Sequence, residues 1–225
     1  MFKNNISKKK ILEELFAKNR LGIKPGLERT LELSKFVDNP HLSFKSIHIA
    51  GTNGKGSVSS AIFSILMESK YKVGLYTSPH LIDFNERIRV NNKLIPDEKI
   101  IEYYKILKNK AEQISATFFE ITSVMAFMYF RETYVDIAVI ETGMGGRFDS
   151  TNIINPLLSI ITKIDYDHQE FLGDTIEKIT YEKCGIIKKN IACIISKNSN
   201  DIYQEIFKNS ENTQQLIFSD KKINL

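Results

Sequence analysis

The sequence predicts an α/β fold, a doubly wound and mostly parallel sheet with helices on both faces. Largely apolar runs of strand length, such as VDIAVI at 135–140 and LLSIIT at 157–162, alternate with segments of helical periodicity. Such runs are typical of strands buried on both faces, and their alternation with helices is typical of a parallel sheet. A glycine-rich strand-to-helix turn and a hydrophobic fraction of 42% over 225 residues agree with one domain that has a sizeable core.

Residues 1–40 predict a helical lead-in to this domain. Lys8 to Lys18 places its apolar residues on one helical face, and Leu27 to Val37 does the same. The LGIKPG segment between them is a turn rich in glycine and proline. The second helix is expected to end before Asn39-Pro40.

The domain itself is predicted over 41–209. It opens with a strand at Lys45 to Ala50, a turn at Gly51 to Gly56 and a helix that starts near Ser57. Residues 77–95 predict an extended loop or hairpin with Asn91-Asn92 at its turn. The other predicted strands are 71–76, 135–140, 157–162 and 191–196, and the other predicted helices are 98–113, 118–133, 175–182 and 201–208. Residues 210–225 form a weakly patterned tail.

Composition argues against several classes of protein. The formal charge of +4 comes from scattered lysines and not from a dense basic tract, so nucleic acid is not an expected partner. Cys184 and Cys193 lack metal-ligand spacing and suggest a reducing compartment. The lysine-rich N-terminus has no following apolar segment of a secretory signal. The longest apolar stretch, 121–130, is far short of a membrane span. We therefore expect a soluble, cytoplasmic protein without a membrane partner.

The stretch IHIAGTNGKGSVSSA carries the most specific chemistry. Glycines in a strand-to-helix turn let the backbone approach an anion, and the helix N-terminus adds a positive dipole end. Lys55 offers a charge for terminal phosphates and Ser57 a hydroxyl for Mg²⁺. A turn that binds nothing is the plain alternative, and a dinucleotide site fits less well because of the lysine. The candidate nucleotide-binding residues are Gly51, Thr52, Asn53, Gly54, Lys55, Gly56 and Ser57.

GTNGKGS resembles the phosphate loop of the Mur ligase superfamily. LGIKPGLERTLELSKF and YTSPHLIDFNERIRVNN resemble its folylpolyglutamate/dihydrofolate synthase branch, and the likeness continues through FFEITSVMAF, VIETGMGGRFDSTNII, ITKIDYDHQEFLGDTIEKI and YEKCGIIK. It covers residues 21–188. The resemblance implies the ATP-binding domain of an ATP-dependent amide ligase in folate metabolism, with dihydropteroate or a reduced folate and L-glutamate as partners.

Several residues outside the loop enter the candidate site. Glu141 closes a buried strand, at the sheet edge where ligands of α/β proteins bind, and could hold Mg²⁺ or serve as a surface acid. The resemblance implies Glu141 and Ser78 in the shell of one Mg²⁺. It implies His168, with Lys183 carbamylated by CO₂, at a second Mg²⁺. Ordinary surface or structural roles are the alternatives. The candidate catalytic residues are Lys55, Glu141, His168 and Lys183.

The implied reaction forms an acyl phosphate from ATP and a substrate carboxylate, and the amine of glutamate then displaces phosphate. Members of the family carry a C-terminal domain after this one, and the sequence predicts that domain to be absent here. The hypotheses are therefore a ligase, alone or with a separately encoded C-terminal half, and a non-catalytic nucleotide-binding remnant. A generic phosphate-loop ATPase is a third. Arg147 and Asp149 in GMGGRFDSTN either take part or only hold this loop.

Overall fold

The computed structural model describes residues 7–18, 25–210, 213 and 215–219. Their strands form one sheet in the order β4-β3-β2-β5-β1-β6-β7-β8. The six strands from β2 to β8 in that order run parallel, and the β3–β4 hairpin adds an antiparallel edge. The bounds are β1 (Lys45–Ala50), β2 (Val73–Tyr76), β3 (Ile88–Val90), β4 (Lys93–Leu94), β5 (Ile137–Glu141), β6 (Leu158–Ile161), β7 (Ala192–Ile195) and β8 (Leu216–Phe218).

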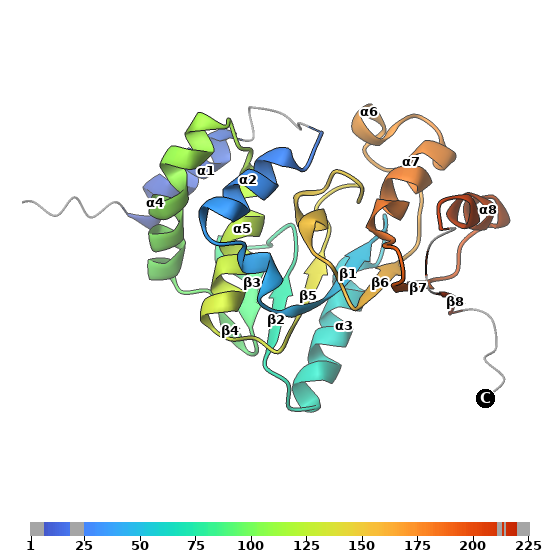
Figure 1. Cartoon of the computed structure of the whole chain (residues 1–225), viewed down its shortest axis with the longest axis horizontal. Helices are drawn as coiled ribbons and strands as arrows, with labels where there is room; N and C mark the ends of the chain where they lie inside the picture. The colour runs from blue at the N-terminus through green and yellow to red at the C-terminus, as the bar shows by residue number, and fades with distance from the viewer. Residues whose placement is uncertain (1–6, 19–24, 211–212, 214, 220–225) are drawn as a thin grey trace, which may run out of the picture.

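Helices cover both faces of this sheet (Figure 1). Alternate residues of one strand point to opposite faces, so Val139 packs with Phe63 on one side while Ala138 and Ile140 pack with the larger helical core on the other. The bounds are α1 (Lys8–Ala17), α2 (Glu28–Phe36), α3 (Lys55–Glu68), α4 (Asp97–Gln113), α5 (Phe118–Glu132), α6 (Gln169–Leu172), α7 (Ile176–Lys183) and α8 (Asn200–Lys208). Short 3₁₀ turns are η2 (Pro40–Leu42), η3 (Phe84–Arg87), η4 (Ser150–Ile153) and η5 (Cys184–Ile186).

Helix α5 is the centre of the larger core. Its first turn is closed by a capping box, in which the Thr117 side chain accepts from the N–H of Glu120 and the Glu120 side chain accepts from the N–H of Thr117. Almost all of its residues from Phe118 to Phe130 are buried. The predicted lead-in packs against it, because Ile11 and Leu33 belong to the same core.

The predicted α/β fold is confirmed, and the differences lie at the ends of elements and in short elements. Helix α3 starts at Lys55, two residues before the predicted start near Ser57, because Gly54 takes up a left-handed conformation with φ of 86° and caps it. Strand β8 lies in the predicted tail, where three residues are too few for a sequence pattern to identify. The one-turn helix α6 was also missed.

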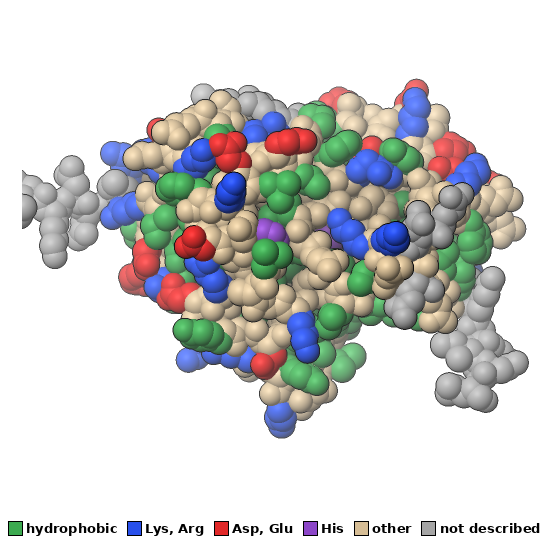
Figure 2. All heavy atoms as spheres, in the orientation of Figure 1, with side chains coloured by type: hydrophobic (Ala, Val, Ile, Leu, Met, Phe, Trp, Pro, Cys, Tyr) green, Lys and Arg blue, Asp and Glu red, His purple; other side chains and the backbone are tan. Residues whose placement is uncertain are grey.

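Charged side chains are dispersed over the surface. Figure 2 shows lysine and arginine side chains interspersed with acidic ones on the face in view, without a continuous basic stripe. Among the described residues no helix is long and apolar enough to cross a bilayer.

Candidate functional site

The glycine-rich turn follows β1 at the carboxyl edge of the sheet. Gly51 has φ of 149°, and a side chain there would collide with the hydroxyl of Thr162, the residue after β6. The N–H groups of Thr52 and Asn53 both donate to the carbonyl of Lys163, at 2.8 and 3.1 Å. The neighbouring strand segment therefore shapes the first half of the turn.

The second half of the turn is the N-terminus of α3. The N–H of Val58 donates to the carbonyl of Gly54, as expected for the start of a helix. The N–H groups ahead of Val58 have no helical acceptor by geometry, so they and the helix dipole suit an anion. Ser57 is exposed at this position. The predicted nucleotide-binding residues thus divide into Thr52 and Asn53, which hold the turn, and Gly54 to Ser57, which offer donors.

Lys55 folds over the mouth of this turn. Its ammonium donates to the carbonyl of Gly51 at 2.9 Å and to that of Thr52 at 3.3 Å. Carbonyl oxygens are weak counterparts for a full positive charge, and a phosphate would be a stronger one. Lys55 therefore supplies a cation at the place where the turn would hold phosphates.

Glu141 lies beside the first turn of α3. It ends β5, where its backbone neighbours Ile49 of β1, and it is only 3% exposed. Burial raises the pKa of its carboxyl to about 7, against the opposing effects of nearby Lys55 and of the Ser78 N–H. The Oε2 atom is buried without a hydrogen-bond partner among the described residues. A buried carboxylate oxygen without a donor fits a divalent cation, because carboxylate oxygens are the ligands that Mg²⁺ prefers.

Lys183, at the end of α7, contacts the same turn. Its side chain is fully buried, and its ammonium donates to Asp167 at 2.8 Å and to the carbonyl of Gly51 at 3.0 Å. Burial lowers the pKa of Lys183, although the pairing with Asp167 opposes this shift. Lys55 and Lys183 therefore converge on one carbonyl, and Asp167 is the residue that balances the buried charge.

His168 stands at the edge of this arrangement. It has a left-handed backbone with φ of 42° and precedes α6. Its side chain is 55% exposed, and Nε2 lies 3.5 Å from Asp167. In the described part of the chain no three His, Cys, Asp or Glu side chains gather as a metal-binding group. The structure thus links His168 to Lys183 through Asp167, and the roles expected of them at a metal stay a prediction.

A hydrogen-bonded acid holds the loop after β5. Asp149 accepts from the N–H groups of Gly143 and Met144 at 2.8 and 2.9 Å and from the N–H and hydroxyl of Thr151. The Thr151 hydroxyl also contacts Nε2 of His48 at 2.8 Å. Burial raises the pKa of Asp149. This residue fixes the loop conformation from within.

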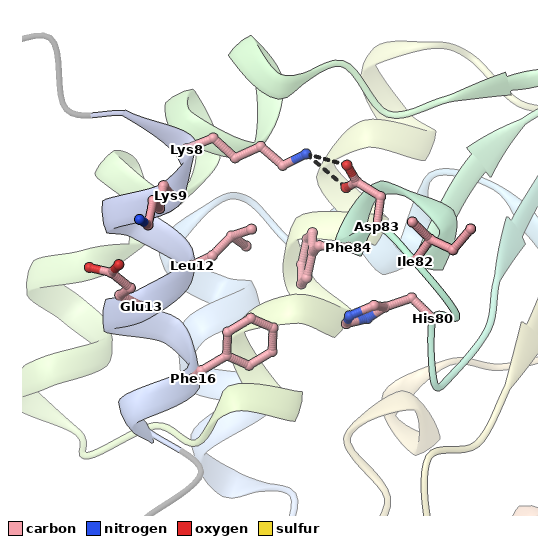
Figure 3. Close-up of a pocket in the computed structure, with 9 residues that line it drawn as sticks. All are labelled: Lys8, Lys9, Leu12, Glu13, Phe16, His80, Ile82, Asp83 and Phe84. Carbon is pink, nitrogen blue, oxygen red and sulfur yellow. Dashed lines mark hydrogen bonds and ion pairs between the residues drawn. The ribbon is translucent and has the colours of Figure 1, made fainter.

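The 77–87 segment approaches the site at Ser78, whose N–H donates to Glu141. The side chain of Glu86 accepts from the N–H groups of Leu81, Ile82 and Asp83, which gives the loop a fixed shape. Between it and α1 lies a groove of about 430 Å³ (Figure 3), where His80 extends from the loop toward Phe16. Leu81 and Ile82 are 91% and 92% exposed.

Sequence patterns alone did not identify three participants. No sequence pattern assigned a role to Asp167 or to Arg87, and Thr162 was only the last residue of the strand predicted at 157–162. Asp167 had a local signal, since an acid beyond a strand end belongs to the edge where ligands bind. The contact of Thr162 with Gly51 had none, because it joins segments far apart in the chain.

Comparison with known proteins places the chain in a family. Residues 49–224 match the model of the Mur ligase middle domain. The chain is 44% identical over 194 residues to the dihydrofolate synthase/folylpolyglutamate synthase of Bacillus subtilis. The matched region covers 83% of this chain and 45% of that protein.

Solved structures give the same result. An FPGS–AMPPCP–folate complex superposes with a TM-score of 0.88 at 35% identity, over 96% of this chain and 55% of the other. FolC of E. coli in complex with DHPP and ADP gives 0.85 at 30% identity, over 92% and 51%. The chain thus spans about half the length of the proteins it matches.

Proposed function

This chain belongs to the Mur ligase family, in the branch of folylpolyglutamate and dihydrofolate synthases, and we propose that it carries the ATP site of an amide ligase. The ligase joins L-glutamate to dihydropteroate or to a folate. The observation that carries this proposal is the meeting of Lys55, Lys183 and the buried Glu141 around one phosphate-binding turn.

The residues divide the work of nucleotide binding. The N-terminus of α3 and Lys55 receive the phosphates. Glu141, Ser57 and Ser78 are the residues that would hold a Mg²⁺, and this ion would offset the phosphate charge. The unpartnered Oε2 atom of Glu141 supports this role. Similar structures that hold AMPPCP or ADP support ATP as the nucleotide.

Lys183 has a further role in this proposal. Its uncharged amine adds to CO₂, so that an N–C bond forms, a proton is released and a carbamate results. His168 and this carbamate would be the groups that hold a second Mg²⁺. Burial lowers the pKa of Lys183, which favours the uncharged amine that the addition needs. Intact-mass measurement under gentle, CO₂-rich conditions tests this role. A persistent absence of the added mass of CO₂, about 44 Da, would count against it.

The chemistry proceeds by an acyl phosphate. An oxygen of the substrate carboxylate attacks the γ-phosphorus, and ADP leaves. The amine of glutamate then attacks the acyl carbon, phosphate leaves, and the amine proton passes to solvent. This chain's residues orient the phosphates and offset the charge on the transferring group, which is the main requirement of such transfer.

ADP release by the purified chain tests the proposal. The assay contains Mg²⁺ and ATP, with dihydropteroate and L-glutamate added together and then each omitted. Release that needs both substrates and is lost in Lys55→Ala supports the ligase. Release independent of the pteroate would indicate a plain ATPase instead. Nucleotide binding without release in any combination would favour the nucleotide-binding role alone, and co-expression with a candidate C-terminal half would then show whether a partner restores turnover.

A further inference from the structure

Arg87 is a buried cation that has no counter-charge among the described residues. It is 6% exposed, and its NH1 atom has no hydrogen-bond partner among the described residues. Lys183 is the other cation in the described part of the chain that is this deeply buried, and it is paired with Asp167. No described carboxylate lies within ion-pair distance of Arg87.

The surroundings of Arg87 fix its side chain but do not neutralise it. Nε donates to Nδ1 of His80 at 2.7 Å, and the guanidinium carbon lies 5.3 Å from the centre of the Phe118 ring. Burial lowers the pKa of Arg87, and the one group that opposes this effect is the hydroxyl of Tyr76. All of these contacts are made by groups without a negative charge.

The two carboxylates nearest along the chain are engaged elsewhere. Glu86 accepts from three backbone N–H groups of its own loop. Asp83 is paired with Lys8 at 2.7 Å. A buried guanidinium without an anion is unfavourable, because its desolvation is not compensated. The positive charge of Arg87 is therefore available to an anion from outside the described residues.

Arg87 stands at the edge of the sheet where the candidate site lies. Its carbonyl accepts from the N–H of Thr77, the residue before Ser78, and the N–H of Ser78 reaches Glu141. We infer that Arg87 binds the carboxylate of the acid substrate through its guanidinium group. This inference rests on the proposed function, because it takes the acid substrate of that ligase as the ligand.

A carboxylate matches Arg87 better than a phosphate of the nucleotide does. The guanidinium is a flat fork that pairs with a planar carboxylate, and its orientation is set in advance by His80 and Phe118. The phosphate-binding donors are already gathered at the turn after β1, around Lys55. A separate cation on the neighbouring 77–87 segment suits the other anionic reactant, whose negative charge must be brought toward the nucleotide.

Binding of two matched probes tests the inference. Pteroate and its carboxamide differ only at one terminal group, where an NH₂ group replaces an oxygen and removes the negative charge. Calorimetric titration of the whole chain with each, in the presence of Mg²⁺ and AMPPCP, gives the ratio of their affinities. We expect the wild type to prefer pteroate, and Arg87→Gln to lower the affinity for pteroate by about tenfold to a hundredfold, as for loss of a charge-assisted hydrogen bond, with little effect on the carboxamide.

Two further variants control the test. Arg89→Gln removes a neighbouring guanidinium that lies over Phe63 instead, and we expect it to keep the wild-type ratio. Arg87→Lys keeps the charge without the fork, and we expect an intermediate ratio. It also serves as the test variant if Arg87→Gln does not fold. The affinity for AMPPCP confirms that each variant retains the nucleotide site.

The outcomes separate the inference from the function on which it rests. An equal loss of affinity for both probes in Arg87→Gln would show that Arg87 only supports the loop, and would overturn the inference. A wild type that binds both probes without preference would overturn it as well, while leaving the proposed substrate class intact. A wild type that binds AMPPCP but neither probe would overturn both.

Discussion

The buried carboxyl of Glu141 should make stability depend on pH in a way that one substitution removes. Burial raises its pKa from the ordinary 4.5 to about 7. In the unfolded chain the group ionises near its ordinary value, while in the folded protein it stays protonated to higher pH. The folded state thus loses stability relative to the unfolded state as pH rises from 4.5 through 7.

The size of this loss follows from the shift. One pKa unit corresponds to about 1.36 kcal/mol, so the full effect is about 3 kcal/mol in the free energy of unfolding. Glu141→Gln keeps the shape of the neutral carboxyl and removes its titration. We therefore expect the free energy of unfolding of the wild type to fall by about 3 kcal/mol relative to that of the variant between pH 4.5 and 8.

Urea unfolding of both proteins at several pH values measures this difference. Other titrating groups are common to the two proteins and cancel in it. A difference that stays flat across this pH range would refute the assignment of a raised pKa to Glu141. Added Mg²⁺ offers a second observation, because a cation bound to the carboxylate should remove much of the loss in the wild type and leave the variant unchanged.

Three other predictions test the packing and charge of the core. Gly74→Ala places a methyl group 2.9 Å from ring atoms of Phe130, and we expect urea unfolding to show a loss of about 1–3 kcal/mol from overpacking. Asp167→Asn leaves the buried Lys183 ammonium without its counter-charge and should lower the free energy of unfolding by about 3 kcal/mol or more. Lys183→Met removes the charge itself and should lower it by less. Equal losses in the two variants would contradict this account. Burial lowers the pKa of His48 from 6.5 to about 3. The free energy of unfolding of the wild type should therefore fall by about 3 kcal/mol relative to that of His48→Gln between pH 7 and pH 4. Parallel acid titrations of both proteins would measure this loss.

Local patterns allowed most of the fold to be predicted. The strand at 45–50 is recovered residue for residue as β1, and the hairpin predicted within 77–95 is formed by β3 and β4. Apolar runs and caps are determined by neighbours in the chain, so they can be read without tertiary structure. Strand β8 could not be read in this way, because its three residues are held by pairing with β7 and not by their own pattern.

The candidate site divides along the same line. The sequence by itself determined the glycine-rich turn that is predicted to bind phosphate, since its glycines, Lys55 and the following helix are contiguous in the chain. Only the tertiary structure decided that Lys183 meets the Gly51 carbonyl from 132 residues away, and that Asp167 balances its charge. Only the tertiary structure shows that Arg87 is buried without such a partner in the part of the chain that it describes. The physical reason is that a charge is neutralised by whatever the packing brings near it, and packing joins segments whose separation along the chain leaves no local pattern.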